Sequence, residues 1–484
     1  MRFALLSMAV LVAAGCSGAD EGPRFDPLPF PDGFLWGTAT AAHQVDGGND
    51  NNDWWAWEQI AGKIANGDVS GDAADHYARF DEDFALAAAM DNDAHRFSIE
   101  WSRVEPARDV RDDAEIAHYH AVLDSLEAHG MVPIVTLSHF TLPLWANDPL
   151  NPAADLDGWF NPEVQGEFAE FAGDMAEEFG DQIDLWVPFN EPMVSAVAAS
   201  QAVFPPDLSA DSVGESLGNA TQWVVGMIFA HGSAYDAIRL RDVADADGDG
   251  IAAQVGIAQH MVAFAPTDPA DPAHVEAAAW LDHVFNRLFL DAITSGNLDV
   301  NLDGDYDDVA TVPPEGSFPQ LAGRLDWVGV NYYRRMLAIP LDLPPLQAYF
   351  QDDPDLPSND LGWTIYPEGM LDVLREVDDY GLPIIVTENG IPDGDDDERP
   401  AYLVDHLVSV QRAIDEGIPV EGYMHWSLVD NFEWAEGFEP RFGLIAVDYA
   451  TQTRTPRTAY DVFAEICREN ALTSGVQKRH RTIE

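Results

Sequence analysis

The sequence has few basic residues and almost no lysine. Its 484 residues include 24 lysines and arginines against 85 aspartates and glutamates, and the formal net charge is −61. Lys63 and Lys478 are the only lysines. Such a chain offers no basic face to neutralise phosphates, so nucleic-acid binding is excluded. The acidic excess indicates either a saline habitat, where salt screens the repulsion, or a genome composition that favours arginine over lysine.

Cysteine and long apolar runs are also scarce. No apolar run reaches about 18 residues, so no membrane-spanning helix is predicted. Residues 1–16 instead have one basic residue, an apolar stretch and small residues before Cys16, as in a secretory signal peptide. This ending resembles a bacterial lipobox, which predicts an exported lipoprotein anchored by lipid on Cys16, at the periplasm or cell surface; ordinary secretion is the alternative. With Cys16 lipidated, Cys467 has no disulfide partner and is expected to be buried and inert.

The chain lacks any long linker rich in proline or serine. Residues 17–27 are predicted to be a short polar linker, and residues 28–475 show no break in composition. One catalytic domain over 28–475 is therefore expected, followed by a flexible basic tail over 476–484. Oligomeric state cannot be read from these features.

Within this span, apolar strand-like runs alternate with helical patterns, such as those over 73–90 and 114–130. Eight buried strands alternating with helices predict an α/β fold, a single (β/α)₈ TIM barrel. A doubly wound open sheet is the alternative, but no G-x-G-x-x-G turn follows any strand. The eight runs are 34–40, 94–99, 132–137, 184–189, 254–259, 325–330, 382–387 and 420–426.

Two of these runs end in a glutamate beside an asparagine. The fourth run stops at Asn190-Glu191 and the seventh at Glu388-Asn389. In a (β/α)₈ barrel the active site lies at the carboxyl ends of the strands, so both glutamates are expected to face one pocket. Two carboxyl groups across a pocket can hydrolyse a glycosidic bond, one as nucleophile and one as general acid and base.

Other strand ends supply groups that suit this chemistry. Arg96 and Tyr333 could hold one carboxylate ionised and separate the two pKa values. Aromatic faces and fixed polar groups are what a sugar pocket needs. Each residue has an ordinary structural alternative: a lone histidine is more often a satisfied core residue, and a loop acid is usually solvated. The candidates of this kind are Gln44, His139, Trp426, Glu433 and Trp434.

Seven motifs in order resemble glycoside hydrolase family 1, the β-glucosidase family. They are "FLWGTATAAHQVDGGN", "HRFSIEWSRVEP", "PIVTLSHFTLPLW", "FNEP", "GVNYY", "TENG" and "HWSLVDNFEWAEGF". The resemblance covers about residues 28–465 and implies a retaining exo-β-glycosidase that acts by double displacement without metal or cofactor. It implies that Glu191 is the general acid/base and Glu388 the nucleophile. The other implied site residues are Gln44, His139, Asn190, Trp426, Glu433 and Trp434 for the terminal sugar, Trp363 on the leaving-group side, and Arg96, Asn331 and Tyr333 around the nucleophile.

The resemblance also bears on the substrate. Family members that act on 6-phosphorylated sugars replace the acid at the position of Glu433, so an unphosphorylated glucoside, fucoside or galactoside is expected. "HQVDGGN" and "HFTLPLW" are similar to the archaeal-type branch of broad specificity. A transglycosylase that uses the same intermediate is an alternative, as is a non-catalytic sugar-binding surface protein. Residues 336–360 are interpreted as an insertion-like loop at the leaving-group entrance.

Two acidic segments, 245–250 and 299–308, resemble the start of calcium-binding loops. An EF-hand loop requires glutamate at its twelfth position, and here that position holds Gly256 or Ala310. Calcium sites and solvated acidic turns both remain open for these segments.

Overall fold

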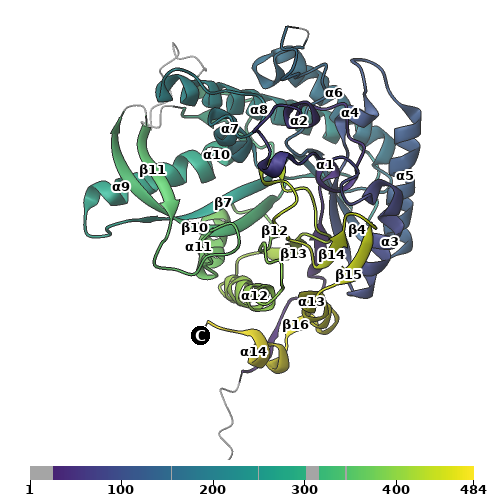
Figure 1. Ribbon diagram of the computed structural model, residues 1–484, viewed down its shortest axis with the longest axis vertical. Coiled ribbons are helices and arrows are strands. Elements are labelled where there is room, and N and C mark those ends of the chain that lie inside the picture. Colours follow the sequence, from purple (N-terminus) through teal and green to yellow (C-terminus); the bar gives the residue numbers. More distant parts are fainter. Residues whose placement is uncertain (1–24, 154, 249, 301–314, 344–345, 484) are drawn as a thin grey trace, which may run out of the picture.

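The structure is a computed structural model that describes residues 25–483 except 154, 249, 301–314 and 344–345 (Figure 1). Each of the eight apolar runs in the sequence contains strand residues, so all eight predicted strands are confirmed. The fifth run is divided between two strands, β6 and β7. The strands are β2 (Leu35–Ala39), β3 (Ala94–Ser98), β4 (Val132–Ser138), β5 (Leu185–Phe189), β6 (Gln254–Val255), β7 (Ala258–Pro266), β10 (Val328–Leu343), β12 (Ile384–Asn389) and β13 (Val420–Trp426).

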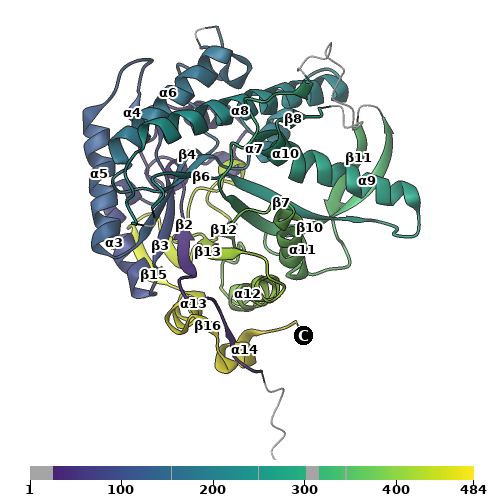
Figure 2. The same ribbon diagram turned by 180° about the vertical axis from the view of Figure 1, so that it is seen from behind.

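These strands close into a parallel ring. β2 pairs with β3, β3 with β4, β4 with β5, and β5 with β6. On the other side β7 pairs with β10, β10 with β12, β12 with β13, and β13 returns to β2. Because β6 and β7 follow one another in the chain, they complete the fifth position of the ring. The predicted (β/α)₈ barrel is confirmed, and Figure 2 shows the ring from the opposite side.

Helices surround the ring, most with one face buried, whereas α12 (Arg399–Asp415) is buried on nearly all sides. In α6, Val164, Phe168, Phe171 and Met175 recur at steps of three and four residues and are all buried. Asn161 caps the helix by accepting from the Glu163 backbone N–H. The surrounding helices are α3 (His76–Ala89), α5 (Asp113–Ala128), α6 (Pro162–Phe179), α8 (Val213–Arg241), α10 (Leu288–Ser295), α11 (Glu368–Asp378), α12 (Arg399–Asp415) and α13 (Thr458–Glu469).

Shorter elements fill the connections. The helices among them are α1 (Ala42–Val45), α2 (Asp53–Glu58), α4 (Trp101–Val104), α7 (Pro192–Ser200), α9 (Pro272–Asp282) and α14 (Ser474–His480). The small antiparallel pairs are β1 (Leu28–Pro29) with β16 (Ala471–Leu472), β8 (Asn297–Leu298) with β9 (Gly316–Ser317), and β14 (Ile445–Asp448) with β15 (Thr453–Pro456).

The segment predicted as an insertion-like loop is partly a β-hairpin. β10 continues to Leu343, well beyond the barrel, and pairs in antiparallel fashion with β11 (Leu346–Asp352). Pro340 is tolerated because at this point β10 pairs only with β11, so no second neighbour needs the missing backbone N–H. The hairpin projects from the barrel beside α9 (Figure 1).

The flexible tail predicted from residue 476 is also wrong for the part of the chain that the structure describes. Residues 474–480 form α14, and Val476 and Gln477 are buried. Gln477 donates to the backbone carbonyls of Asp26 and Leu472 at 2.8 and 2.9 Å. The basic composition of this segment suggested a solvated tail, and composition alone does not show such long-range hydrogen bonds.

Three further expectations concern the ends and the acidic turns. The signal peptide, the lipidation site Cys16 and most of 299–308 lie outside the described residues. In the 245–250 turn the Asp245 carboxylate accepts hydrogen bonds from the backbone N–H groups of Gly248 and Gly250. These bonds do not decide between a calcium site and a solvated turn, and calcium there stays a prediction. Cys467 is buried as predicted, and burial raises the pKa of its thiol. Within the described ranges, no helix combines the length and the apolar character needed to cross a bilayer.

Candidate active site

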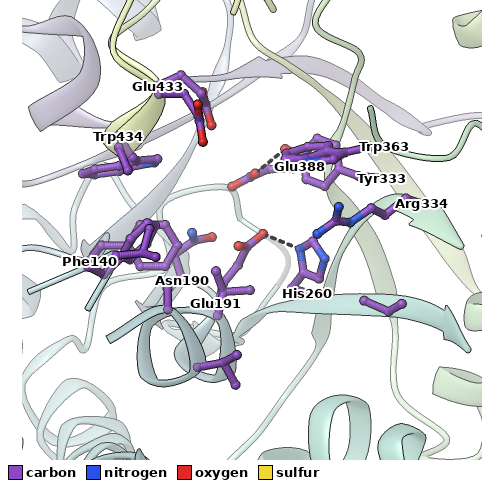
Figure 3. Close-up of a pocket in the computed structure, with 18 of the residues that line it drawn as sticks. Phe140, Asn190, Glu191, His260, Tyr333, Arg334, Trp363, Glu388, Glu433 and Trp434 are labelled. Atoms are coloured by element: carbon purple, nitrogen blue, oxygen red, sulfur yellow. Dashed lines mark hydrogen bonds and ion pairs between the residues drawn. The ribbon is translucent and has the colours of Figure 1, made fainter. Parts of the chain in front are cut away.

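Glu191 and Glu388 lie at the carboxyl ends of two barrel strands and line one cavity. Glu388 is the second-last residue of β12, and Glu191 lies two residues after the end of β5, where it is the N-cap of α7. Both glutamates are buried: 6% of the surface of Glu191 and 4% of the surface of Glu388 is exposed. The cavity has a volume of about 320 Å³ and both side chains point into it (Figure 3). The predicted convergence of the two strand ends is confirmed.

Glu388 is held by a cation and a phenol. Arg96, on β3, donates to its Oε1 at 2.5 Å, and the Tyr333 hydroxyl donates to its Oε2 at 2.6 Å. Arg96 is 1% exposed, so its charge is little screened by water. Both neighbours stabilise the ionised carboxylate, as the sequence analysis expected of them.

Glu191 has a different set of neighbours. Its Oε1 accepts from Asn331 Nδ2 at 2.7 Å and lies 3.1 Å from His260 Nδ1. Asn331 and His260 are aligned partners on β10 and β7, so two adjacent strands present both groups together. His260 was missed by sequence analysis, although it directly follows the fifth apolar run and the strand-end rule could have found it.

Asn190 connects the two carboxyl groups. Its Oδ1 accepts from Arg96 at 2.7 Å and from Asn331 at 3.1 Å. The amide nitrogen is therefore left to donate to His139 Nε2, 3.2 Å away. Burial and the charge of Arg96 lower the pKa of His139 well below its ordinary value, so the ring is neutral. Its proton then sits on Nδ1, which has no hydrogen-bond partner among the described residues and can donate to a bound hydroxyl.

Burial governs the ionisation of the pair. It raises the pKa of Glu388 to about 7, and the charge of Glu191 adds to this rise, while Arg96 and Tyr333 oppose it. The pKa of Glu191 is lowered, although burial opposes this: the interactions with His260, the Asn331 hydrogen bond and the charge of Arg96 outweigh the effect of burial. Because the two carboxyl groups face each other and are coupled, they lose their protons in two steps that belong to the pair, and the proton kept up to near-neutral pH is shared by Glu388 and Glu191 and not assigned to one of them.

Aromatic and polar groups form the end of the cavity away from the hairpin. His139 stacks between Trp426 and Trp434, with ring centroids 5.9 and 6.0 Å away and planes within 13°. Burial raises the pKa of Glu433 to about 8, helped by the charges of Glu388 and Glu191. A protonated Glu433 can donate to one hydroxyl and accept from another. Gln44 donates weakly to Glu433, at 3.4 Å.

The predicted site residues fall into two groups. His139, Asn190, Glu191, Tyr333, Trp363, Glu388, Trp426, Glu433 and Trp434 line the cavity. Gln44, Arg96 and Asn331 do not line it, but contact residues that do. The cavity-lining residues that sequence analysis missed are mainly aromatic or aliphatic and come from α7, β7, the hairpin, the helical segment His283–Arg287 and the loops: Phe140, Val194, Val197, Ala198, Val203, Phe204, Val262, Phe264, Phe285, Met336, Phe350, Ala435 and Phe442. The polar residues that were missed are Gln201, His260, Arg334 and Glu436.

Comparisons with known proteins agree with this geometry. The family model for glycosyl hydrolase family 1 matches residues 27–472. A β-galactosidase from Pyrococcus woesei is 34% identical, over 93% of this chain and 99% of its own, and β-glucosidase A from Thermotoga maritima is 32% identical, over 92% and 98%.

Solved structures match equally well. A β-glycosidase from Pyrococcus horikoshii has a TM-score of 0.82 and 32% identity, covering 95% of this chain and 99% of that one. A Thermotoga maritima β-glucosidase in complex with glucoimidazole has a TM-score of 0.82 and 30% identity, covering 92% and 99%.

Proposed function

Because this chain belongs to glycosyl hydrolase family 1, we propose that it is a retaining, exo-acting β-glycosidase. Its substrates are unphosphorylated β-glycosides with a terminal glucosyl, galactosyl or fucosyl unit at the non-reducing end. Relatives named β-glucosidase and β-galactosidase match over almost their whole length, which supports this range.

The proposed reaction has two displacement steps. The Glu388 carboxylate attacks the anomeric carbon, the bond to the glycosidic oxygen breaks, and Glu191 gives its proton to that oxygen. The Glu191 carboxylate then takes a proton from water, whose oxygen attacks the anomeric carbon and releases Glu388. The anomeric carbon is inverted twice, so the product keeps the β configuration.

The observation that carries this proposal is the unequal setting of two buried carboxyl groups that face one cavity. Glu388 contacts the permanent charge of Arg96, which suits a nucleophile that must be ionised. Glu191 has both recorded hydrogen bonds on Oε1. These two groups leave Oε2 of Glu191 free, and a proton on Oε2 can be donated to the leaving oxygen.

The setting of Glu433 supports a substrate without phosphate. A protonated or ionised carboxyl there suits hydroxyl groups, whereas a phosphate needs a cation. Among the described residues that line the cavity, Arg334 is the one arginine or lysine, and it is already paired with Asp352.

Replacing the nucleophile tests the proposal. Glu388→Ala should abolish hydrolysis of p-nitrophenyl β-glucoside, while Glu421→Gln should leave it intact because Glu421 is an exposed position of β13. Proton NMR of the first sugar released by the wild type should show the β anomer. Full activity of Glu388→Ala, or an initial α product, would refute the mechanism.

Two finer points belong to the same proposal. Transfer of the glycosyl unit to an alcohol instead of water would make the enzyme a transglycosylase, and product analysis with and without acceptor alcohols measures that balance. We also propose export as a lipoprotein anchored through Cys16, on the strength of residues 1–16 alone. Mass spectrometry of the native N-terminus tests it: an unmodified Met1 would refute export.

A further inference from the structure

A slot with mainly apolar walls leads outward from Glu191. The first wall is one face of α7, a helix that begins directly after Glu191. Val194, Val197 and Ala198 line the cavity and are spaced by three and four residues, so they share one face of the helix. Whatever is bonded to an oxygen at Glu191 must therefore continue along this face.

The opposite wall is a sheet formed by the strand extensions beyond the barrel. Side chains alternate between the two faces of a strand, and every second residue of β7 faces the cavity, namely His260, Val262 and Phe264. Met336 pairs with Phe264 across to β10, and Phe350 on β11 continues the same face. The wall is thus polar next to Glu191 and apolar further out.

The outer end of this wall has its own small core. Phe264 and Phe350 pack against Ala278 and Leu281 of α9 and against Ala338 of the hairpin. Their ring centroids lie 6.0 Å apart. The apolar wall is consequently a supported surface and not a set of loosely held side chains.

Polar groups are few along the slot. Gln201 follows α7, and Arg334 donates to Asp352 while its guanidinium lies over the Trp363 ring, 4.7 Å from the centroid. Figure 3 shows Arg334 and Trp363 on the hairpin side of the two glutamates. A second sugar in the slot would lose water from its hydroxyls and find few replacements, which is costly. An alkyl chain or aromatic ring would instead gain from the same desolvation.

We propose that this slot holds the leaving group and selects an apolar alcohol, alkyl or aromatic, over a second sugar. The inference rests on the proposed function, because it takes Glu191 as the group that protonates the leaving oxygen. It adds the chemical class of the leaving group and names α7, β7 and the β10–β11 hairpin as the elements that recognise it.

A series of alkyl β-glucosides tests the proposal. Burying one methylene group favours binding by an amount that corresponds to about fourfold in kcat/KM. For methyl, butyl and hexyl β-glucosides, measured below their micelle concentrations, kcat/KM should rise by about two- to fourfold per methylene. The hexyl glucoside should also be cleaved faster than cellobiose. A flat series, or a preference for cellobiose, would overturn this inference. No hydrolysis of any glucoside would instead refute the proposed function.

Variants locate the effect. Val197→Gln puts a polar side chain on the slot face of α7 and should flatten the rise of kcat/KM with chain length. Val275→Gln makes the same change on α9 at a 46% exposed position that does not line the cavity, and it should retain the wild-type slope. Equal slopes for the two variants would contradict the assignment of the slot. Should Val197→Gln fail to fold, the wild-type series still decides.

Discussion

Removing the hydroxyl of Tyr333 tests how the site controls Glu388, its proposed nucleophile. Tyr333→Phe deletes the donor 2.6 Å from Glu388 Oε2 and leaves the ring in place. A hydrogen bond to a charged group contributes about 1.5–3 kcal/mol, and about 1.4 kcal/mol corresponds to one pKa unit. The pKa of Glu388, about 7 in the wild type, should therefore rise by about one to two units. At pH 6 the ionised fraction should fall about 10- to 100-fold.

The assay uses 2,4-dinitrophenyl β-glucoside, because its leaving group departs without a proton from Glu191. The rising limb of kcat/KM with pH then reports the ionisation step of the coupled pair that frees the Glu388 carboxylate, without a requirement for a proton on Glu191. We expect the rising limb of Tyr333→Phe to move to higher pH and to approach the wild-type plateau well above it. Arg96→Met should move the limb in the same direction, because a buried cation is lost. An unmoved limb with a uniformly lower plateau would show that Tyr333 acts only through packing and would refute the reasoning.

Three other changes follow from the same structure. His260→Asn keeps a hydrogen-bond donor but removes the interaction with His260 that lowers the pKa of Glu191, so the pKa of this proposed acid/base should rise and the pH optimum for p-nitrophenyl β-glucoside should shift upward; an unchanged or lower optimum would contradict this. In the folded protein the pKa of Glu433 is raised from 4.5 to about 8. Between these pH values the folded state holds a proton on Glu433 that the unfolded state has lost, so the free energy of unfolding falls as the pH rises from about 4.5 to about 8. Between pH 5 and 8 the Tm of Glu433→Gln should therefore fall less than the Tm of the wild type, and the variant should bind sugar more weakly. An equal fall in Tm for both proteins would argue against a buried proton on Glu433. A Cβ on Gly390 would lie 1.8 Å from the Trp426 carbonyl oxygen, so Gly390→Ala should destabilise the protein by about 1–3 kcal/mol and reduce activity. Gly394→Ala, whose nearest contact is 3.8 Å away, is the matched control for calorimetry.

The sequence predicted most of the barrel because its strands are buried on both faces. Runs such as 132–137 and 382–387 are continuously apolar, and that pattern is local. The strand-end rule then locates Glu191 and Glu388 from the sequence alone. The hairpin that the outer part of β10 forms with β11 was missed, because a segment containing Pro340 is typical of a loop as long as its single pairing partner is unknown.

The apolar slot was missed for a related reason. Val194 and Val197 have the pattern of any amphipathic helix, and Phe264 and Phe350 that of ordinary core residues. Only the fact that these side chains face one another across the cavity distinguishes them from residues that pack in the core. Whether they face one another depends on how far β7 and β10 extend beyond the barrel, and no local sequence pattern predicts that length.

The amino-acid sequence by itself determined the strands, the helices and the two glutamates at strand ends, because these follow from short-range periodicity and from the direction of parallel strands. Sequence analysis also named Arg96 and Tyr333 as neighbours of Glu388, but only the tertiary structure decided their contact distances and placed His260 beside Glu191. Arg96 reaches Glu388 across 292 positions of the chain and His260 reaches Glu191 across 69. Burial then sets their pKa values, and burial is a property of the closed ring, since a carboxyl group is desolvated only when all its distant neighbours are in place.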